Sequence, residues 1–212
     1  MSRLLLATRN SGKLRELRSL LGGEAIELVA LDECPEIGEI EETGRTFEEN
    51  AALKAAAAAR ASRCFALGED SGLEVDALGG APGVYSARFA GRHGDDEANN
   101  RKLIRDLRGK ENRVARYVCA MVLADPSGEV IATTRGVCEG RIRDEPKGHN
   151  GFGYDPYFVP DAARVTMAEL EPQMKDAISH RGQALRAMVG LLHLHLGRAE
   201  EPAAPLTEPT VR

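Results

Sequence analysis

Apolar and polar positions at the start of the chain follow first a strand pattern and then a helix pattern. Residues 3–7 form a short apolar run that stops at a polar turn, residues 8–13. Leucines then recur at helical spacing over residues 14–21, and residues 26–31 form a second short apolar run. A strand, a helix and a second strand in this order predict an α/β fold.

The next segment combines a capped helix with a short strand. Thr46 and Glu49 fit a capping box, in which Thr46 is the N-cap and Glu49 reaches back to it, ahead of an alanine-rich helix over residues 50–61. Residues 64–67 predict a short strand that delivers the polar segment 69–72 at its end.

Glycine, proline and aspartate mark turns between further periodic segments in the rest of the chain. We expect one domain over residues 1–197 and a disordered tail over residues 198–212, where apolar residues are few. The other predicted elements are a long loop at residues 79–94, a helix at 95–107, a β-hairpin of strands at 116–124 and 130–137, a glycine-rich aromatic segment at 148–158 and a last helix at 179–196.

Composition and charge limit the partners and the cellular compartment that we expect for this protein. The net charge of −5 and an aromatic content of 4% argue against a nucleic-acid binder, which needs a basic face or stacking platforms. No apolar run approaches the length of about 18 residues that spans a membrane. The first residues lack the layout of a secretory signal, so we expect a cytoplasmic protein. The four cysteines contain no CxxC pair and are expected to be small core residues.

The polar turn 8–13 offers a site for an anion. Backbone N–H groups and the dipole at the start of a helix favour negative charge, and Lys13 adds a full positive charge. Thr8 and Asn10 add short polar donors for phosphate oxygens. The alternative is that Asn10 or Ser11 only caps the helix.

Two acidic segments are candidates for metal binding or catalysis. Asp70 follows a predicted strand, at the edge where open α/β sheets bind ligands, and a carboxylate there can hold Mg²⁺ or orient an attacking water. The alternative is an aspartate that forms a turn or caps a helix. Glu41 and Glu42 form a second acidic pair, which completes a metal site if it lies beside Asp70 and is otherwise a solvated loop.

A glycine-rich segment in the last third of the chain suits a flat ligand. Around Gly153, glycines permit close approach, Phe152 and Tyr154 supply stacking faces, and Asp155 supplies an acceptor. The alternative is a tight turn whose aromatic residues fill the core.

The start of the last helix carries an unusual pair of basic residues. With Ser179 as the predicted N-cap, His180 and Arg181 lie in the first turn, and Lys175 precedes them. The helix dipole disfavours cations at that end. A ligand placed opposite them would explain the arrangement.

Together these segments resemble the inosine/xanthosine triphosphate pyrophosphatase family, which acts on non-canonical purine nucleoside triphosphates. The resemblance covers the chain from residue 4 to about residue 192, and the blocks in this order are far more specific together than singly. The blocks are residues 8–13 (TRNSGK), 41–51 (EETGRTFEENA), 70–75 (DSGLEV), 79–88 (GGAPGVYSAR), 151–156 (GFGYDP) and 178–182 (ISHRG).

The resemblance implies an elongated α/β domain with two lobes, a central mixed sheet flanked by helices and an active-site cleft between the lobes. It also implies a homodimer that uses Mg²⁺ and hydrolyses ITP, dITP, XTP and dXTP to the monophosphate and pyrophosphate. Such an enzyme cleanses the nucleotide pool, and we expect it to have neither a nucleic-acid nor a membrane partner.

The resemblance also assigns roles to individual residues. Asp70 and Glu41 would hold Mg²⁺, and Asp70 would accept a proton from the attacking water. Glu69 departs from the family pattern, which commonly has aspartate at this position. The residues expected to bind the substrate are Thr8, Asn10, Lys13 and Lys54 at the triphosphate, Ser71, and Phe152, Gly153, Tyr154, Asp155, Lys175, His180 and Arg181 at the base.

Two other functions compete with this interpretation. The first is a Maf-like pyrophosphatase, which has a similar fold and chemistry but prefers other nucleotides. The second is a non-catalytic nucleotide-binding regulator, which would be expected to lack Asp70, Lys13 or Glu41, and this chain has all three.

Overall fold

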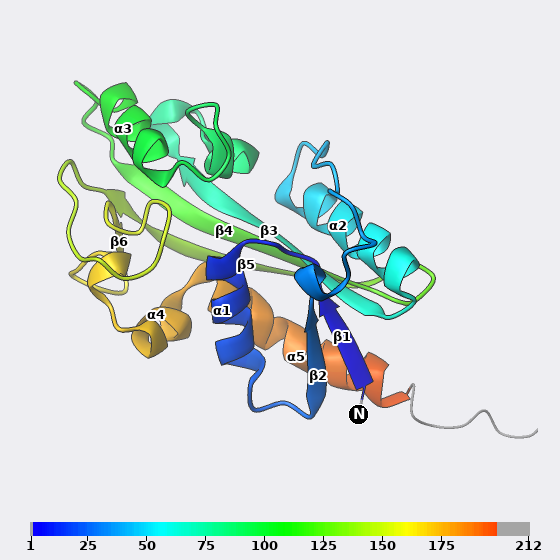
Figure 1. Ribbon diagram of the computed structural model, residues 1–212. Coiled ribbons are helices and arrows are strands. Elements are labelled where there is room, and N and C mark those ends of the chain that lie inside the picture. The colour runs from blue at the N-terminus through cyan, green and yellow to red at the C-terminus, as the bar shows by residue number, and fades with distance from the viewer. Residues whose placement is uncertain (1, 199–212) are drawn as a thin grey trace, which may run out of the picture.

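A six-stranded mixed sheet runs through the protein in the order β2-β1-β3-β4-β5-β6 (Figure 1). The computed structural model describes residues 2–198. The first strand pairs in parallel with the second and third, and all other pairs are antiparallel. The strands are β1 (Ser2–Leu6), β2 (Ile26–Ala30), β3 (Phe65–Val75), β4 (Val114–Ala124), β5 (Val130–Ile142) and β6 (Phe158–Pro160).

Helices cover both faces of this sheet. On one face α1 and α5 pack against leucines and methionines of the sheet, and on the other face α2 packs through its alanines. The predicted α/β fold with a central mixed sheet is therefore confirmed. The helices are α1 (Ser11–Leu21), α2 (Phe47–Ser62), α3 (Asp96–Asp106), α4 (Pro172–Ile178) and α5 (His180–Arg198), with short 3₁₀ turns at Leu31–Glu33, Asp76–Leu78, Gly83–Arg88 and Met167–Glu169.

The long strands β3, β4 and β5 connect two lobes (Figure 1). One lobe holds β1, β2, α1 and α2, and the other holds α3, α4 and β6. The second lobe has its own apolar cluster, which includes Leu73, Leu103, Phe158 and Met167. The described residues thus form three apolar clusters, one on each face of the sheet and one in the second lobe, and all three include residues of β3 and β4.

The third strand differs from the expected short strand at residues 64–67. It begins at Phe65 and continues to Val75, straight through the acidic segment that was expected to follow it. The reason is its partner, because β4 pairs with β3 without interruption from Ala66 to Val75 and keeps these polar residues in the ladder.

The strand that ends at this point is β1. Its last pair with β3 joins Leu6 to Leu67. Beyond Leu67, no described strand pairs with that edge of β3, apart from a single bridge between Glu74 and Pro82. This edge of β3 is therefore open, and side chains on both faces of the strand are accessible from it.

Two glycines let helices approach the sheet closely. A Cβ on Gly68 of β3 would lie 2.1 Å from the carbonyl oxygen of Ala51 in α2, and a Cβ on Gly136 of β5 would lie 2.1 Å from the carbonyl oxygen of His180 in α5. Neither contact could accommodate a larger residue without movement of the backbone. The close approach brings the polar residues of α2 and α5 to the part of β3 that follows Leu67.

Most other expectations for secondary structure are confirmed, with some corrections. The hairpin of β4 and β5 is longer than predicted, the helix near residues 95–107 is α3, and α4 was not predicted. Thr46 caps α2 by accepting the N–H of Glu49, but the carboxylate of Glu49 accepts the N–H of Arg45 and not that of Thr46. Apart from Arg198, which ends α5, the predicted tail of residues 198–212 lies outside the described residues.

The cysteines and the helices bear on two other expectations. Cys119 and Cys138 are buried, as expected for small core residues, whereas Cys34 and Cys64 are half-buried, and all four thiols are free. Within residues 2–198, no helix combines the length and the apolar character that a membrane span requires.

Candidate active site

A cavity of about 630 Å³ opens where β1 ends beside β3. Its walls come from the start of α1, from α2 and β3, from the turn that includes residues 152–155, and from α4 and α5. All the site residues expected from the sequence line it, with the exception of Glu41: Thr8, Asn10, Lys13, Lys54, Asp70, Ser71, Phe152, Gly153, Tyr154, Asp155, Lys175, His180 and Arg181.

The turn that begins at Thr8 forms one end of the cavity. Asn10 caps α1, since its side-chain oxygen accepts the N–H of Lys13 at 3.1 Å, and its own N–H bonds the Thr8 hydroxyl at 3.2 Å. The capping role considered from the sequence is therefore real, and the same residue also faces the cavity. The ammonium of Lys13 lies 3.3 Å from Glu69. Burial alone would lower the pKa of Lys13, but Glu69 and Asp70 outweigh burial and raise it.

Asp70 lies at the same end and is held by three donors. Its Oδ2 accepts a hydrogen bond from Asn50 at 3.0 Å, and its Oδ1 accepts the N–H of Ser71 at 3.0 Å. The ammonium of Lys54 lies 3.5 Å from Oδ1. Asn50 and Lys54 are four residues apart on α2 and so share the helix face that packs on β3.

Glu41 and Glu42, the acidic pair predicted in the loop before α2, lie in different environments. Glu41 is exposed and does not line the cavity. Glu42 lines it, 2.8 Å from the Lys54 ammonium and 3.4 Å from Arg88, which ends the 3₁₀ turn Gly83–Arg88. Burial would raise the pKa of Glu42, but Lys54 reverses this effect and the pKa is lowered. Among the described residues, no cluster of three or more acidic, histidine or cysteine side chains forms a complete metal site.

Neighbouring residues of β3 serve opposite sides of the sheet, as in any strand. Asp70 faces Asn50 and Lys54 of α2, whereas Glu69 and Ser71 face Arg181 of α5. The Ser71 hydroxyl also donates to Glu69 at 2.9 Å. One short stretch of strand therefore contributes to both ends of the cavity.

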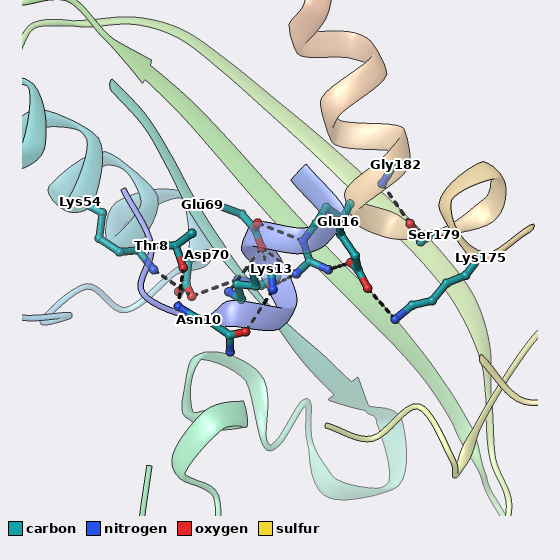
Figure 2. A network of polar contacts seen from close by, with 12 residues as sticks. Thr8, Asn10, Lys13, Glu16, Lys54, Glu69, Asp70, Lys175, Ser179 and Gly182 are labelled. Atoms are coloured by element: carbon teal, nitrogen blue, oxygen red, sulfur yellow. Dashed lines mark hydrogen bonds and ion pairs between the residues drawn. The ribbon is translucent and has the colours of Figure 1, made fainter. Parts of the chain in front are cut away.

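The other end is built on a chain of buried charges of alternating sign. Glu69 accepts two bonds from Arg181, at 2.8 and 3.0 Å, and Arg181 also bonds Glu16. Glu16 pairs with Lys175 at 2.8 Å, and Lys175 pairs with Asp155 at 2.6 Å. Figure 2 shows the polar contacts from Lys54 and Asp70, through Lys13 and Glu69, to Glu16 and Lys175.

Burial and pairing act against one another on these groups. Burial would raise the pKa of the Glu69 carboxyl, but Arg181 and Lys13 hold it well below its usual value. Burial would likewise raise the pKa of Glu16, and Arg181 and Lys175 lower it. Burial would lower the pKa of Lys175, but Asp155 and Glu16 raise it. The carboxylates of Glu69 and Glu16 thus compensate the positive charge at the start of α5, which sequence reasoning assigned to a ligand alone.

His180 lies in the first turn of α5, with its ring stacked on Tyr117 at a centroid distance of 4.7 Å and an angle of 9°. Burial, with the charge of Arg181 beside it, holds the pKa of His180 well below its usual value. The imidazole is therefore neutral near pH 7, with one nitrogen that donates and one that accepts. Its buried Nδ1 has no hydrogen-bond partner within the described part of the chain.

The turn 151–155 combines both roles considered for it. The ring of Phe152 lies 5.0 Å from the ammonium of Lys175 and lines the cavity. Asp155 stabilises the turn by accepting the N–H of Phe152 at 3.0 Å. Tyr154 also lines the cavity but is largely buried, and its hydroxyl donates to the carbonyl of Ser86. Tyr154 therefore fills the core, as the alternative interpretation of a tight turn predicted.

Sequence reasoning missed three residues of the site: Glu16 bridges two cations of the base end, Tyr117 stacks on His180, and Asn50 bonds Asp70. Glu42 was considered only as part of an acidic pair. The spacing of Asn50 and Lys54 on one face of a predicted helix was a usable signal. The sequence offers no such signal for Glu16 and Tyr117, because their partners lie more than 60 residues away.

The arrangement joins a cationic turn and a carboxylate at one end to a partly apolar, hydrogen-bonding pocket at the other. The profile of the Ham1 family matches residues 4–191. A dITP/XTP pyrophosphatase of an Exiguobacterium species is 54% identical over 88% of this chain and 94% of its own length, and one of Streptomyces avermitilis is 48% identical over 93% and 100%.

Solved structures agree with these relatives. A HAM1 protein from Coxiella burnetii superposes with a TM-score of 0.83 at 41% identity, covering 92% of this chain and 100% of that one. A nucleoside-triphosphatase / dITP/XTP pyrophosphatase from Mycobacterium abscessus gives a TM-score of 0.71 at 46% identity, covering 90% and 99%. The relationship predicted from the ordered sequence blocks is confirmed, and the chain belongs to the Ham1 family.

Proposed function

We propose that this protein hydrolyses non-canonical purine nucleoside triphosphates, namely ITP, dITP, XTP and dXTP, to the monophosphate and pyrophosphate. The observation that carries the proposal is the position of Asp70, beside a helix start and two lysines at one end of a cavity whose other end suits a base. The dITP/XTP pyrophosphatases that resemble the chain over nearly their whole length support it.

Asp70 accepts the proton of the attacking water in this mechanism. A bond forms between the water oxygen and the α-phosphorus, and the bond between the α-phosphorus and the bridging oxygen of pyrophosphate breaks. Negative charge develops on the departing pyrophosphate, where Lys13, Lys54 and the N–H groups at the start of α1 stabilise it. Thr8 and Asn10 bind phosphate oxygens beside them.

The donor set fits a magnesium site in which the substrate phosphates would supply the remaining ligands. Mg²⁺ prefers oxygen ligands and is typically held by one or two carboxylates together with substrate phosphates. Asp70 would supply one carboxylate, and the loop before α2 would supply the second, from Glu41 by family resemblance or from Glu42, which lines the cavity. When bound, the ion supplies charge neutralisation at the phosphate oxygens.

The base end favours a purine with an oxygen at the 6-position over ATP. ITP and XTP carry an oxygen at the 6-position of the base, which can accept a hydrogen bond from His180 or Arg181. ATP carries an amino group there, which places a donor against a donor. A buried polar group left without a partner can cost several orders of magnitude in rate. Phe152 supplies a face for the base, while Lys175 and Asp155 fix the pocket.

Pyrophosphate release from ITP, XTP, GTP and ATP, with and without Mg²⁺, tests the proposal. We expect kcat/KM for ITP and XTP to exceed that for ATP by at least about 100-fold. ATP as the best substrate would refute it, and preference for a modified pyrimidine would favour a Maf-like enzyme. Absence of pyrophosphate release, while ITP still raises Tm, would identify a nucleotide-binding regulator.

The variants Glu41→Gln and Glu42→Gln decide which carboxylate of the loop serves the metal. The concentration of Mg²⁺ that gives half-maximal rate should rise for the variant that removes a ligand and should be unchanged for the other. Equal values in both variants and the wild type would remove both glutamates from the metal site.

Two further properties follow from the family resemblance and from composition. We propose that the chain forms a homodimer and acts in the cytoplasm on a small-molecule substrate, without a nucleic-acid or membrane partner. Light scattering on the purified protein measures the oligomeric state directly, and a monomer at micromolar concentration would contradict the first property.

A further inference from the structure

Asn50 is fully buried on α2 and bonds two parts of the site at once. Its Nδ2 donates to Oδ2 of Asp70 at 3.0 Å, and its Oδ1 accepts the N–H of Gly44 at 2.8 Å. Gly44 ends the acidic segment that contains Glu42. The side chain therefore joins α2, the acidic loop and β3 at one point.

The direction of these bonds is fixed by chemistry. A backbone N–H can only donate, so the oxygen of the Asn50 amide must face Gly44. The NH₂ group must then face Asp70, and because it can only donate, Oδ2 of Asp70 must accept. Ser71 donates its N–H to the other oxygen of the same carboxylate. Two donors on different oxygens set the plane of the Asp70 carboxylate.

A second buried asparagine holds a loop without bonding any charged group of the cavity. Asn99 on α3 is 2% exposed, accepts the N–H of Ala90 at 2.7 Å and donates to the carbonyl of Ala87 at 3.3 Å. Both asparagines hold a loop to a helix. Only Asn50 bonds a carboxylate that lines the cavity, so the two residues form a matched pair.

We propose that Asn50 is a positioning residue for the reaction, one that aligns the Asp70 carboxylate with the attacking water and ties it to the acidic loop at Gly44. The proposal rests on the role of Asp70 proposed above. Asn50 contacts neither Lys13 nor Arg181, which bind the triphosphate and the base. Its loss should therefore lower kcat and leave KM for ITP nearly unchanged.

The test compares Asn50→Ala with Asn99→Ala. For Asn50→Ala we expect kcat on ITP to fall by about 10-fold to 100-fold with KM within about threefold of wild type, because general-base assistance typically contributes 10²–10⁴-fold and is lost in part. Asn99→Ala should lower Tm but keep kcat within about twofold. Equal kcat values in the two variants, or an effect of Asn50→Ala on KM alone, would overturn the proposal.

A double variant separates alignment from a general loss of structure. If Asn50 acts through Asp70, adding Asn50→Ala to Asp70→Asn should reduce the residual rate no further. A second reduction of 10-fold or more would mean that Asn50 acts independently, which contradicts the proposal. If Asp70→Asn alone keeps near-normal turnover, the assignment of Asp70 fails and this inference fails with it. If Asp70→Asn is inactive and Asn50→Ala resembles Asn99→Ala, only this inference fails.

Folding of the variants is measured by circular dichroism and Tm before the rates are compared. Should Asn50→Ala not fold, Asn50→Ser replaces it, since its hydroxyl leaves a polar group in the same buried space but is too short to replace the amide on both sides. The same loss of kcat at constant KM is expected, and a wild-type kcat in the Ser variant would overturn the proposal.

Discussion

The two ends of the cavity are assembled in different ways. At the phosphate end, one continuous turn supplies Thr8, Asn10 and Lys13, and the loop before α2, α2 itself and β3 add Glu42, Lys54 and Asp70. At the base end, the charges come from α1, β3, the turn before β6, α4 and α5, and each is buried against a partner of opposite sign. The cationic turn of the first end is local in sequence, whereas the charge chain of the second end exists only after the fold has formed.

This difference predicts different responses to substitution. A change at the phosphate end should act mainly on rate, because its groups face the substrate. A change at the base end should act on stability as well, because removal of one buried charge leaves its partner without compensation.

The largest effect is expected for Asp70→Asn at the phosphate end. The change removes the proton acceptor but keeps the shape of the side chain, so kcat on ITP should fall by about 10³-fold. The dissociation constant for ITP, measured by calorimetry, should stay within a few-fold of wild type. Turnover near that of the wild type would contradict the assignment of Asp70 as the proton acceptor.

Arg181→Met should cause the largest loss of stability. Glu69 and Glu16 would be left buried without their main partner, which costs about 3–5 kcal/mol in the free energy of unfolding. Lys54→Met should cost less, because Glu42 keeps contact with solvent and with Arg88, and Asp70 keeps its bonds from Asn50 and Ser71. Urea denaturation measures both values, and equal losses would remove the contrast between the two ends.

A double variant sharpens this prediction. Adding Glu69→Gln to Arg181→Met removes one of the uncompensated charges, so the double variant should be more stable than Arg181→Met alone. A double variant that is less stable than the single one would show that the loss comes from packing and not from charge.

The stability of the protein should also depend on pH through His180. Its pKa is lowered in the folded state, so below the ordinary value of 6.5 the unfolded chain binds a proton that the folded protein does not. Stability present above that pH should be lost as the pH falls, by about 1.4 kcal/mol per pH unit. Glu69 and Glu16 have pKa values below the ordinary glutamate value of 4.5. They therefore add to the loss of stability only when the pH falls below that value.

The measurement is urea denaturation between pH 7.5 and pH 5.5, in the wild type and in His180→Gln. The variant should lose less stability over this range than the wild type. Equal slopes in the two proteins would show that His180 does not carry the effect.

The smallest effect is expected for the ring that supports His180. Tyr117→Leu removes the stack, worth about 1 kcal/mol, and should raise KM for ITP by about fivefold. Tyr117→Phe keeps the stack and should change KM less. If both substitutions raise KM equally, the hydroxyl of Tyr117 and not its ring supports the site.

The contrast also explains which parts of the site the sequence could predict. The turn that contains Thr8, Asn10 and Lys13 was found because its groups are adjacent in the chain and lie between a strand and a helix. Glu16 was not found, because its role depends on Lys175 and Arg181, more than 150 residues away. Helical periodicity places Glu16 on α1, but periodicity cannot say which charges face it.

The fold shows the same division. The α/β class and most helices follow from local patterns, but the length of β3 does not. Polar residues such as Asp70 and Ser71 are typical of turns, and they remain in a strand here because β4 pairs with them throughout. Long-range pairing therefore overrides the local preference at the point where the site forms.

The alternation of Glu69, Asp70 and Ser71 along β3 makes the length of the strand more critical than its composition. Deletion of one residue ahead of Glu69 would turn every later side chain to the opposite face, so that Asp70 would point toward Arg181. No single substitution can reverse such a shift. We therefore expect evolution to tolerate insertions and deletions in the turn between β4 and β5, and to exclude them from the stretch between Phe65 and Ser71.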